Sequence, residues 1–267
     1  MRASVIERVK QIANIAAQAS KPARFRVMLK KLYRRVRARR KGRKHEKNKQ
    51  WIERHCSDFE ELALAIDADL WEEAVEVSSA LETRAQVKLD EIEPSLGGGG
   101  AYPILYFITR HIEPVNIVET GVAAGFSSYS FLAAIKANRK GHLYSSDFPY
   151  FRLRDPEQYI GMVVPEDLRD NWSLYVEGDD RNIPKILEQV GEIGLFHYDS
   201  DKTYDGRERA VSMIENRLKE DAVVLMDDIQ DNSFFSDYVA DNEVEKWWIF
   251  EFEGKYVGMI GDLKPSG

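Results

Sequence analysis

Short apolar runs alternate with helix-like patterns through the second half of the chain. We expect strands at residues 115–120, 142–147, 172–176, 195–199 and 222–227, with segments between them whose apolar residues recur at helical spacing. Strands that alternate with helices in this way predict a doubly wound parallel sheet, because each helix returns the chain to the edge where the next strand starts.

Two further strands are expected at residues 246–252 and 255–260. Only Glu253 and Gly254 separate them. This connection is too short for a crossover helix, so the two strands must pair antiparallel. The predicted fold class is therefore α/β, with a doubly wound, Rossmann-like, seven-stranded and mostly parallel sheet whose last strand is antiparallel.

The first third of the chain shows helical periodicity. From Asp58, which suits an N-cap, one long helix is expected to continue towards Ile92, and Pro94 and the glycines at 97–100 end it. These glycines precede an expected helix at 101–111, so they form either a simple hinge or the base of a mobile flap over a ligand.

Three parts of the chain follow from these patterns. Residues 1–50 form a basic, partly helical N-terminal arm, residues 51–96 a helical lid or cap, and residues 97–267 the α/β domain. The fold is therefore expected to carry an N-terminal helical extension.

The composition agrees with a globular domain of ordinary size. The chain has 267 residues, 43% of them hydrophobic, and its single cysteine, Cys56, excludes an intrachain disulfide. Its longest apolar run, at residues 101–108, is shorter than the ~20 residues of a membrane-spanning helix, and the N-terminus lacks the apolar core of a signal peptide. We expect a cytoplasmic protein, either free or peripheral at a membrane.

Charge separates the arm from the rest of the chain. The first 50 residues hold 18 lysines and arginines against two glutamates, whereas residues 51–267 hold 20 against 43 acidic residues. Such an arm suits an anionic membrane surface, nucleic acid, or the acidic domain of its own or a partner chain, and the simpler alternative is a solvated tail. Nucleic acid is the weaker expectation, because no aromatic platform or DNA-binding motif accompanies the charge. We expect the arm to contribute location rather than chemistry.

The most informative local signal lies at residues 117–128, where an apolar strand ends in a glycine turn and opens into a helix. Gly121 allows a sharp turn close to a ligand, Gly125 allows close packing of strand and helix, and the free N–H groups favour a polar group. The spacing lacks the third glycine of the dinucleotide fingerprint. Glu119, two residues before the first glycine, instead suits a ligand with an ammonium group.

These residues resemble motif I of the class I methyltransferases that depend on S-adenosylmethionine (SAM), E-x-G-x-x-x-G-x-S. The alternative is a turn whose glycines serve geometry alone. The resemblance implies that residues 97–267 are a SAM-dependent methyltransferase domain, and that the motif binds the cofactor through Glu119, Gly121, Gly125 and Ser127.

Acidic residues follow the carboxyl ends of the predicted strands, where ligands bind in doubly wound sheets. Asp147 ends the second strand, about 20 residues beyond the glycines, so it suits the ribose hydroxyls of a nucleoside. Asp179 and Asp180 follow the third strand, where the family commonly places a residue against the adenine. Asp179 is equally suited to cap the helix that follows.

Three more aspartates end the next two strands: Asp199 the fourth, and Asp227 and Asp228 the fifth. Adjacent strand ends bring these carboxylates together, and they repel one another unless a cation lies between them. Oxygen ligands favour Mg²⁺ or another hard divalent cation over zinc. The alternative is that Asp227 and Asp228 cap the following helix.

Residues 100–262 resemble the metal-dependent O-methyltransferases. In the catechol type, a strand-four Asp binds the metal and a lysine three residues later is the general base, a spacing that Asp199 and Lys202 match. The catechol-type ligands after strand five are an Asp-Asn pair, and Asp228 replaces the Asn here. The pattern is closer to the macrocin-type sugar O-methyltransferases, whose metal is held by three aspartates.

The resemblance implies divalent-metal-dependent transfer of the SAM methyl group to a hydroxyl of a vicinal diol, on a sugar or glycan intermediate. Lys202 and Asp199 would be the catalytic residues, and the alternative for Lys202 is a surface lysine paired with Asp201 or Asp205. Competing interpretations are a catechol or phenol O-methyltransferase, a nicotinamide oxidoreductase, and a non-enzymatic protein that binds membrane or nucleic acid through its arm. The sequence leaves a homo-oligomer open.

Overall fold

The computed structural model describes residues 5–39, 45–92, 96 and 99–263. Their strands form one eight-stranded sheet in the order β1-β7-β8-β6-β5-β2-β3-β4. The strands are β1 (Cys56–Ser57), β2 (Asn116–Thr120), β3 (His142–Ser146), β4 (Trp172–Tyr175), β5 (Ile193–Tyr198), β6 (Leu218–Met226), β7 (Trp247–Phe252) and β8 (Lys255–Ile260). β2 to β6 pair in parallel, and β8 runs antiparallel to β6 and β7. The doubly wound sheet and its reversed last strand are confirmed.

β1 is an eighth strand beyond the seven that the sequence predicts. It pairs parallel with β7, with Cys56 opposite Ile249 and Ser57 opposite Phe250. A strand of two residues is too short to show an alternating pattern, so no periodicity in the sequence reveals it.

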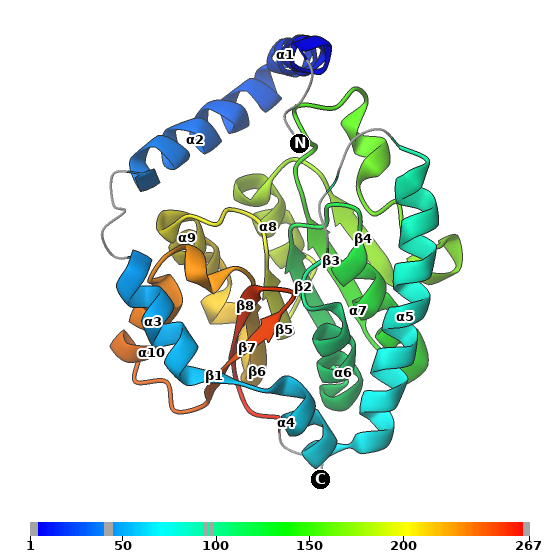
Figure 1. Cartoon of the computed structure of the whole chain (residues 1–267), viewed down its shortest axis with the longest axis vertical. Helices are drawn as coiled ribbons and strands as arrows, with labels where there is room; N and C mark the ends of the chain where they lie inside the picture. Colours follow the sequence, from blue (N-terminus) through cyan, green and yellow to red (C-terminus); the bar gives the residue numbers. More distant parts are fainter. Residues whose placement is uncertain (1–4, 40–44, 93–95, 97–98, 264–267) are drawn as a thin grey trace.

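Helices cover both faces of the sheet (Figure 1). One layer contains α4 (Phe59–Ile66), α5 (Ala68–Asp90), α6 (Tyr102–Ile112) and α7 (Phe126–Asn138), and the other contains α3 (His45–His55), α8 (Asp179–Leu187), α9 (Tyr204–Ile214) and α10 (Phe234–Asp241). Successive strand residues point to opposite layers: Ile117 packs in the first core and Val118 in the second. Burial on both faces explains why these strands read as continuous apolar runs.

The single helix expected from Asp58 to Ile92 is in fact two helices. Asp58 caps α4 as predicted, accepting a hydrogen bond from the Glu60 N–H at 2.8 Å. At Asp67 the backbone leaves the helical region (φ −160°, ψ 99°), and the Asp67 carboxylate caps α5 by accepting from the Leu70 N–H at 2.9 Å. The apolar periodicity continues across the break because both helices pack on the same layer, while the aspartate supplies a local alternative to the helical hydrogen bond.

The N-terminal arm forms α1 (Val5–Ala19) and α2 (Pro22–Arg39), which lie outside the two helical layers at one end of the molecule (Figure 1). α3 crosses the expected boundary between arm and cap and packs on the domain. Its buried Asn48 donates hydrogen bonds to the carbonyls of Ile229 and Asn232 at 3.1 and 2.7 Å. None of the described helices combines the length and apolar character needed to cross a bilayer.

Candidate active site

The strand order reverses direction between β2 and β5, and this switch point places two predicted site residues in contact. Gly121, directly after β2, has φ +86°, and a Cβ there would lie 2.4 Å from the carbonyl oxygen of Asp199, directly after β5. Gly125 has φ +104°, and a Cβ there would lie 2.8 Å from the Cα of Gly161. Both glycines are therefore required by conformation and by close approach.

A cavity of about 670 Å³ opens above this switch point. Of the predicted site residues, it is lined by five that follow β2, β3, β4 and β5, namely Gly121, Asp147, Asp179, Asp180 and Asp199. Its size lies within the range of small-molecule sites. The remaining predicted residues do not line it.

The Asp147 carboxylate lies on the glycine turn. Its Oδ2 accepts hydrogen bonds from the N–H groups of Val122 and Ala123 at 3.2 and 2.8 Å, and its Oδ1 accepts from the Phe148 N–H at 2.6 Å. The turn N–H groups that the sequence assigned to a ligand thus bind a carboxylate of the protein. These bonds fix the orientation of Asp147 at the cavity wall.

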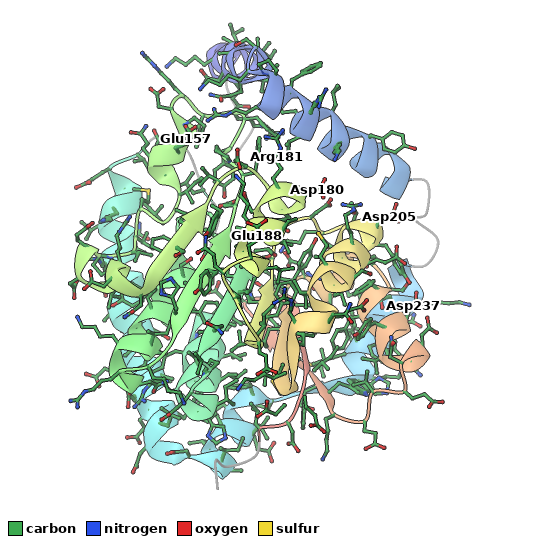
Figure 2. All side chains as sticks on the ribbon, turned by 180° about the vertical axis from the view of Figure 1, so that it is seen from behind. Glu157, Asp180, Arg181, Glu188, Asp205 and Asp237 are labelled. Carbon is green, nitrogen blue, oxygen red and sulfur yellow. The ribbon has the colours of Figure 1, made fainter. Side chains whose placement is uncertain are left out.

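Asp179 and Asp180 begin α8, on the far side of the same cavity. Asp179 accepts hydrogen bonds from the hydroxyls of Ser146 and Ser200, while Gly178 occupies the cap position, so Asp179 is not the helix cap. Asp180 accepts from the Lys30 ammonium of α2 at 2.9 Å. Figure 2 shows Asp180 and Arg181 at the end of the domain that faces α2.

Glu119 lies inside the domain, beneath the glycine turn. It is fully buried, and its carboxylate accepts hydrogen bonds from the hydroxyls of Ser127, Ser128 and Ser145. The predicted cofactor residues Glu119 and Ser127 therefore contact each other, and they link β2, β3 and the start of α7. Their arrangement stabilises the turn from below.

The second group of predicted residues gathers at the ends of β5 and β6, which are neighbours as expected. The Lys202 ammonium forms ion pairs with Asp199 and with Asp228, the latter at 2.7 Å. Both partners are aspartates that follow the ends of the two strands. Its ammonium lies where the sequence placed a cation.

Asp227 faces the interior. Its Oδ1 lies 3.5 Å from Nε2 of buried His197, and a Cβ at Gly100 would lie 2.3 Å from its Oδ2. Hard carboxylate oxygens suit Mg²⁺, but the described residues contain no group of three His, Cys, Asp or Glu side chains arranged to hold a metal.

The flap expected at the glycines 97–100 is described only in part, because Gly97 and Gly98 lie outside the described residues.

Burial holds the pKa of Lys202 below the ordinary lysine value, against the attraction of Asp227 and Asp228, which favours the ammonium. A lysine with a lowered pKa is a better base near neutral pH. The geometry thus places Lys202 beside Asp199, which lines the cavity.

Several site residues were not predicted. Buried Arg207 donates to the carbonyls of Asp227 and Asp228 at 2.7 and 2.9 Å and so fixes the turn after β6. Val27 and Lys30 of α2 line the cavity. No local spacing in the sequence links these residues to the strand ends, so no pattern could have identified them.

Residues 118–229, which run from β2 to the turn after β6, match the protein family described as a methyltransferase domain. A curated relative, the ribosomal RNA large subunit methyltransferase E of Methanosphaera stadtmanae, is 24% identical over 121 residues, or 45% of this chain. The chain spans only 59% of that relative's length.

Solved structures share the arrangement of strands and helices. The O-methyltransferase TomG from Streptomyces achromogenes, solved in complex with SAM, is 15% identical, with 68% of this chain and 89% of TomG covered and a TM-score of 0.54. A methyltransferase from Geobacter sulfurreducens is 17% identical over 70% of this chain and 90% of its own, with a TM-score of 0.51. The O-methyltransferase from Bacillus cereus, in complex with SAH, is 12% identical over 79% of this chain and 100% of its own, with a TM-score of 0.51.

Proposed function

We propose that this protein transfers the methyl group of SAM to a hydroxyl oxygen, because residues 118–229 match the methyltransferase domain family and the fold is that of a SAM-bound O-methyltransferase. The observation that carries the proposal is the 670 Å³ cavity at the switch point, where Gly121, Asp147 and Asp179 meet. The SAM and SAH complexes of the TomG and Bacillus cereus O-methyltransferases support it.

The order of the strand ends gives each cofactor residue a role. The methionine part lies at Gly121, above the buried charge of Glu119. The ribose hydroxyls donate to Asp147 at the end of β3, and the adenine lies beyond β4, next to Asp179 and Asp180. Ionised carboxylates are strong acceptors for such hydroxyl and amino donors.

Methyl transfer requires an acceptor oxygen in line with the bond between sulfur and methyl carbon. As the bond between oxygen and carbon forms, the bond between carbon and sulfur breaks, and the sulfonium becomes the neutral thioether of SAH. The acceptor hydroxyl must lose its proton, and we assign Lys202 Nζ as the base, because it lies beside Asp199 at the cavity wall and burial lowers its pKa. Asp199, which pairs with Lys202, orients the amine.

We further propose that a hard divalent cation such as Mg²⁺ binds Asp199 and Asp228 in place of the Lys202 ammonium, and that Asp227 would turn from the interior to become a third ligand. When bound, the cation would acidify a chelated vicinal diol, which is the reason to prefer a sugar or glycan acceptor, with a catechol as the alternative. The ion pairs that Asp199 and Asp228 both form with the Lys202 ammonium support this proposal, because they show a positive charge between the two carboxylates.

RNA is a second candidate acceptor. The curated relative is named a ribosomal RNA methyltransferase, and the arm carries a net positive charge that suits a phosphate backbone. No recognised nucleic-acid-binding motif accompanies the charge of the arm, so a small diol remains the first candidate.

Calorimetric titration of the full chain with SAM tests the cofactor assignment, with NAD as the negative control. Transfer of labelled methyl groups is then measured with sugar diols, catechol and an RNA oligonucleotide, each with Mg²⁺ and with EDTA. Binding of SAM and methylation of a diol only with Mg²⁺ is the expected result. Transfer that is complete in EDTA would leave a metal-free methyltransferase, and binding of NAD without SAM would reject the proposed function.

The arm has a separate proposed role at an anionic membrane surface. Phe25, Leu29 and Tyr33 form one stripe of α2, and they are 45%, 48% and 67% exposed. Exposed apolar side chains beside basic residues are typical of helices that lie in a membrane interface. Binding to anionic vesicles should fall with added salt and should weaken in Leu29→Asp but not in Val87→Asp, a change at an exposed valine of α5. Salt-independent binding, or equal loss in both variants, would reject this role.

A further inference from the structure

The second helix of the arm forms one wall of the cavity at the switch point. Val27 and Lys30 line the cavity together with the residues that follow β3 and β4. A Cβ at Gly178 would lie 3.7 Å from Val27 Cγ1 and 3.2 Å from Phe148 Cδ2, so both side chains lie against the end of β4. α2 therefore covers the cavity beside Gly178, after the end of β4.

Polar contacts hold the arm across this end of the domain. They join three arm residues to three points around the cavity: Lys30 to Asp180, Arg24 to Glu157, and Asn14 to the carbonyl of Arg152. Figure 2 shows Glu157 and Asp180 on the end of the domain that α1 and α2 cover. The contacts fix where α2 lies over the cavity.

The ion pair between Lys30 and Asp180 is a weak contact. The Lys30 side chain is 61% exposed, and ion pairs at such positions contribute little to stability. A ligand that touches both α2 and the strand ends would therefore add a large share of the interaction that holds the arm in place. Such a ligand binds more tightly when α2 is docked, and it shifts the arm towards the docked position.

The position of α2 indicates which part of the ligand it contacts. If the methionine part lies after β2 and the ribose after β3, the third unit of the ligand lies after β4, next in the strand order. Phe148, from the loop after β3, lies against Gly178 at this end of the cavity and packs on Phe151 with ring centroids 5.1 Å apart, which gives the cavity an apolar wall. A flat, largely apolar base would have this wall on one side and Val27 on the other.

We propose that α2 is part of the cofactor site: Val27 packs on the adenine of SAM, and Lys30 holds Asp180 in place for the same group. The inference rests on the proposed function, because it takes SAM as the ligand of the cavity. It departs from the sequence-based expectation that the arm contributes location alone. Cofactor entry and release then require α2 to move away from the end of β4.

Calorimetry of the full chain with SAM tests the proposal, with two variants and two matched controls. Val27→Asp should weaken SAM binding about tenfold, because it removes apolar contact, and Lys30→Ala should weaken it about two- to fivefold. Lys21→Ala and Val9→Asp change exposed arm residues outside the cavity, and they should bind SAM like the unmodified chain. Circular dichroism checks that each variant is folded.

Hydrogen exchange provides a readout that does not depend on substitution. Addition of SAM should slow the exchange of the α2 amides, while the amides of α10, away from the cavity, should be unchanged. If the unmodified chain binds SAM but the Val27 and Lys30 variants bind equally well and α2 exchange is unaffected, the role of α2 is rejected and the proposed function stands. If the unmodified chain does not bind SAM, both are rejected.

Discussion

At the end of the crevice formed by β2, β3 and β4, Asp147 and Asp179 accept hydrogen bonds from neutral backbone N–H and hydroxyl groups. At the end formed by β5 and β6, Asp199 and Asp228 instead face the ammonium of Lys202. The neutral donors fix the orientation of these two carboxylates. At the second end, the Lys202 ammonium neutralises the charge of Asp199 and Asp228. A ligand of this cluster must therefore displace the lysine or interact with it directly.

We interpret this difference as a division between an end that binds SAM and an end that takes part in the methyl transfer. The first end is preorganised for the hydroxyl and amino donors of a nucleoside, because hydrogen bonds fix the orientation of the Asp147 and Asp179 carboxylates. The second end contains a cation whose protonation state can change, because burial lowers the pKa of Lys202. Substitutions at the first end should therefore alter SAM affinity, and substitutions at the second should alter turnover.

The largest expected effect is that of Lys202→Met. Loss of a general base should reduce turnover on the order of 10²–10⁴-fold, while SAM affinity should change little, because Lys202 does not line the cofactor cavity. Steady-state kinetics and calorimetry measure the two quantities. Lys49→Met, at a lysine on α3 that pairs with Glu53, is the matched control.

The pH profile sharpens the same prediction. Lys202 accepts a proton only as the neutral amine, and its pKa is lowered, so turnover should rise with pH and level off below the ordinary pKa of lysine. The rising limb should be absent from the residual activity of Lys202→Met. An unchanged profile would mean that another group takes the proton.

Gly121→Ala should have the next largest effect, because Gly121 joins the two ends of the crevice. A Cβ would lie 2.4 Å from the Asp199 carbonyl oxygen at a φ of +86°. The strained φ alone costs roughly 1–3 kcal/mol, and the overlap adds a similar amount. We expect a lower melting temperature and loss of SAM binding.

Gly254→Ala is the control for this substitution. Gly254 also has positive φ, +77°, but nothing lies within 4 Å of the added Cβ. Gly254→Ala should therefore show the loss of stability that the positive φ causes, without a steric overlap of the added Cβ. Equal destabilisation in the two variants would contradict the close approach of Gly121 to Asp199.

The fold could be predicted because its main elements are visible as local patterns. Seven strands and the reversed last strand follow from apolar runs and from the short connection at Glu253 and Gly254. β1 is too short to show a pattern, and the break at Asp67 is hidden because the apolar stripe continues across it. Local signals therefore identify elements better than they identify where those elements end.

The site was predictable only as far as the strand ends determine it. The topology brings Asp147, Asp199 and Asp227 to one edge of the sheet, but the partner of each carboxylate depends on residues from other elements. Lys30 and Asp180 are 150 positions apart in the chain, and no spacing rule connects them. Physical contact between distant segments, rather than composition, decides which carboxylates are neutralised.

The smallest effects are expected for substitutions of Asp147 and Glu119, and the two should change different quantities. Asp147→Ala should weaken SAM binding by roughly 1–3 kcal/mol, the scale of charge-assisted hydrogen bonds left unmade. Glu119→Gln should instead lower the free energy of unfolding by roughly 1–3 kcal/mol, because the amide nitrogen cannot accept from the buried serine hydroxyls that now donate to Glu119.

Calorimetry with SAM and chemical denaturation of the same two variants measure both quantities. The interior position of Glu119 predicts that Glu119→Gln changes stability more than affinity, and that Asp147→Ala does the reverse. If Glu119→Gln unfolds like the unmodified chain but loses SAM binding, Glu119 contacts the methionine part directly, as the motif implies. The division between a supporting interior and a binding surface at this end of the crevice would then be wrong.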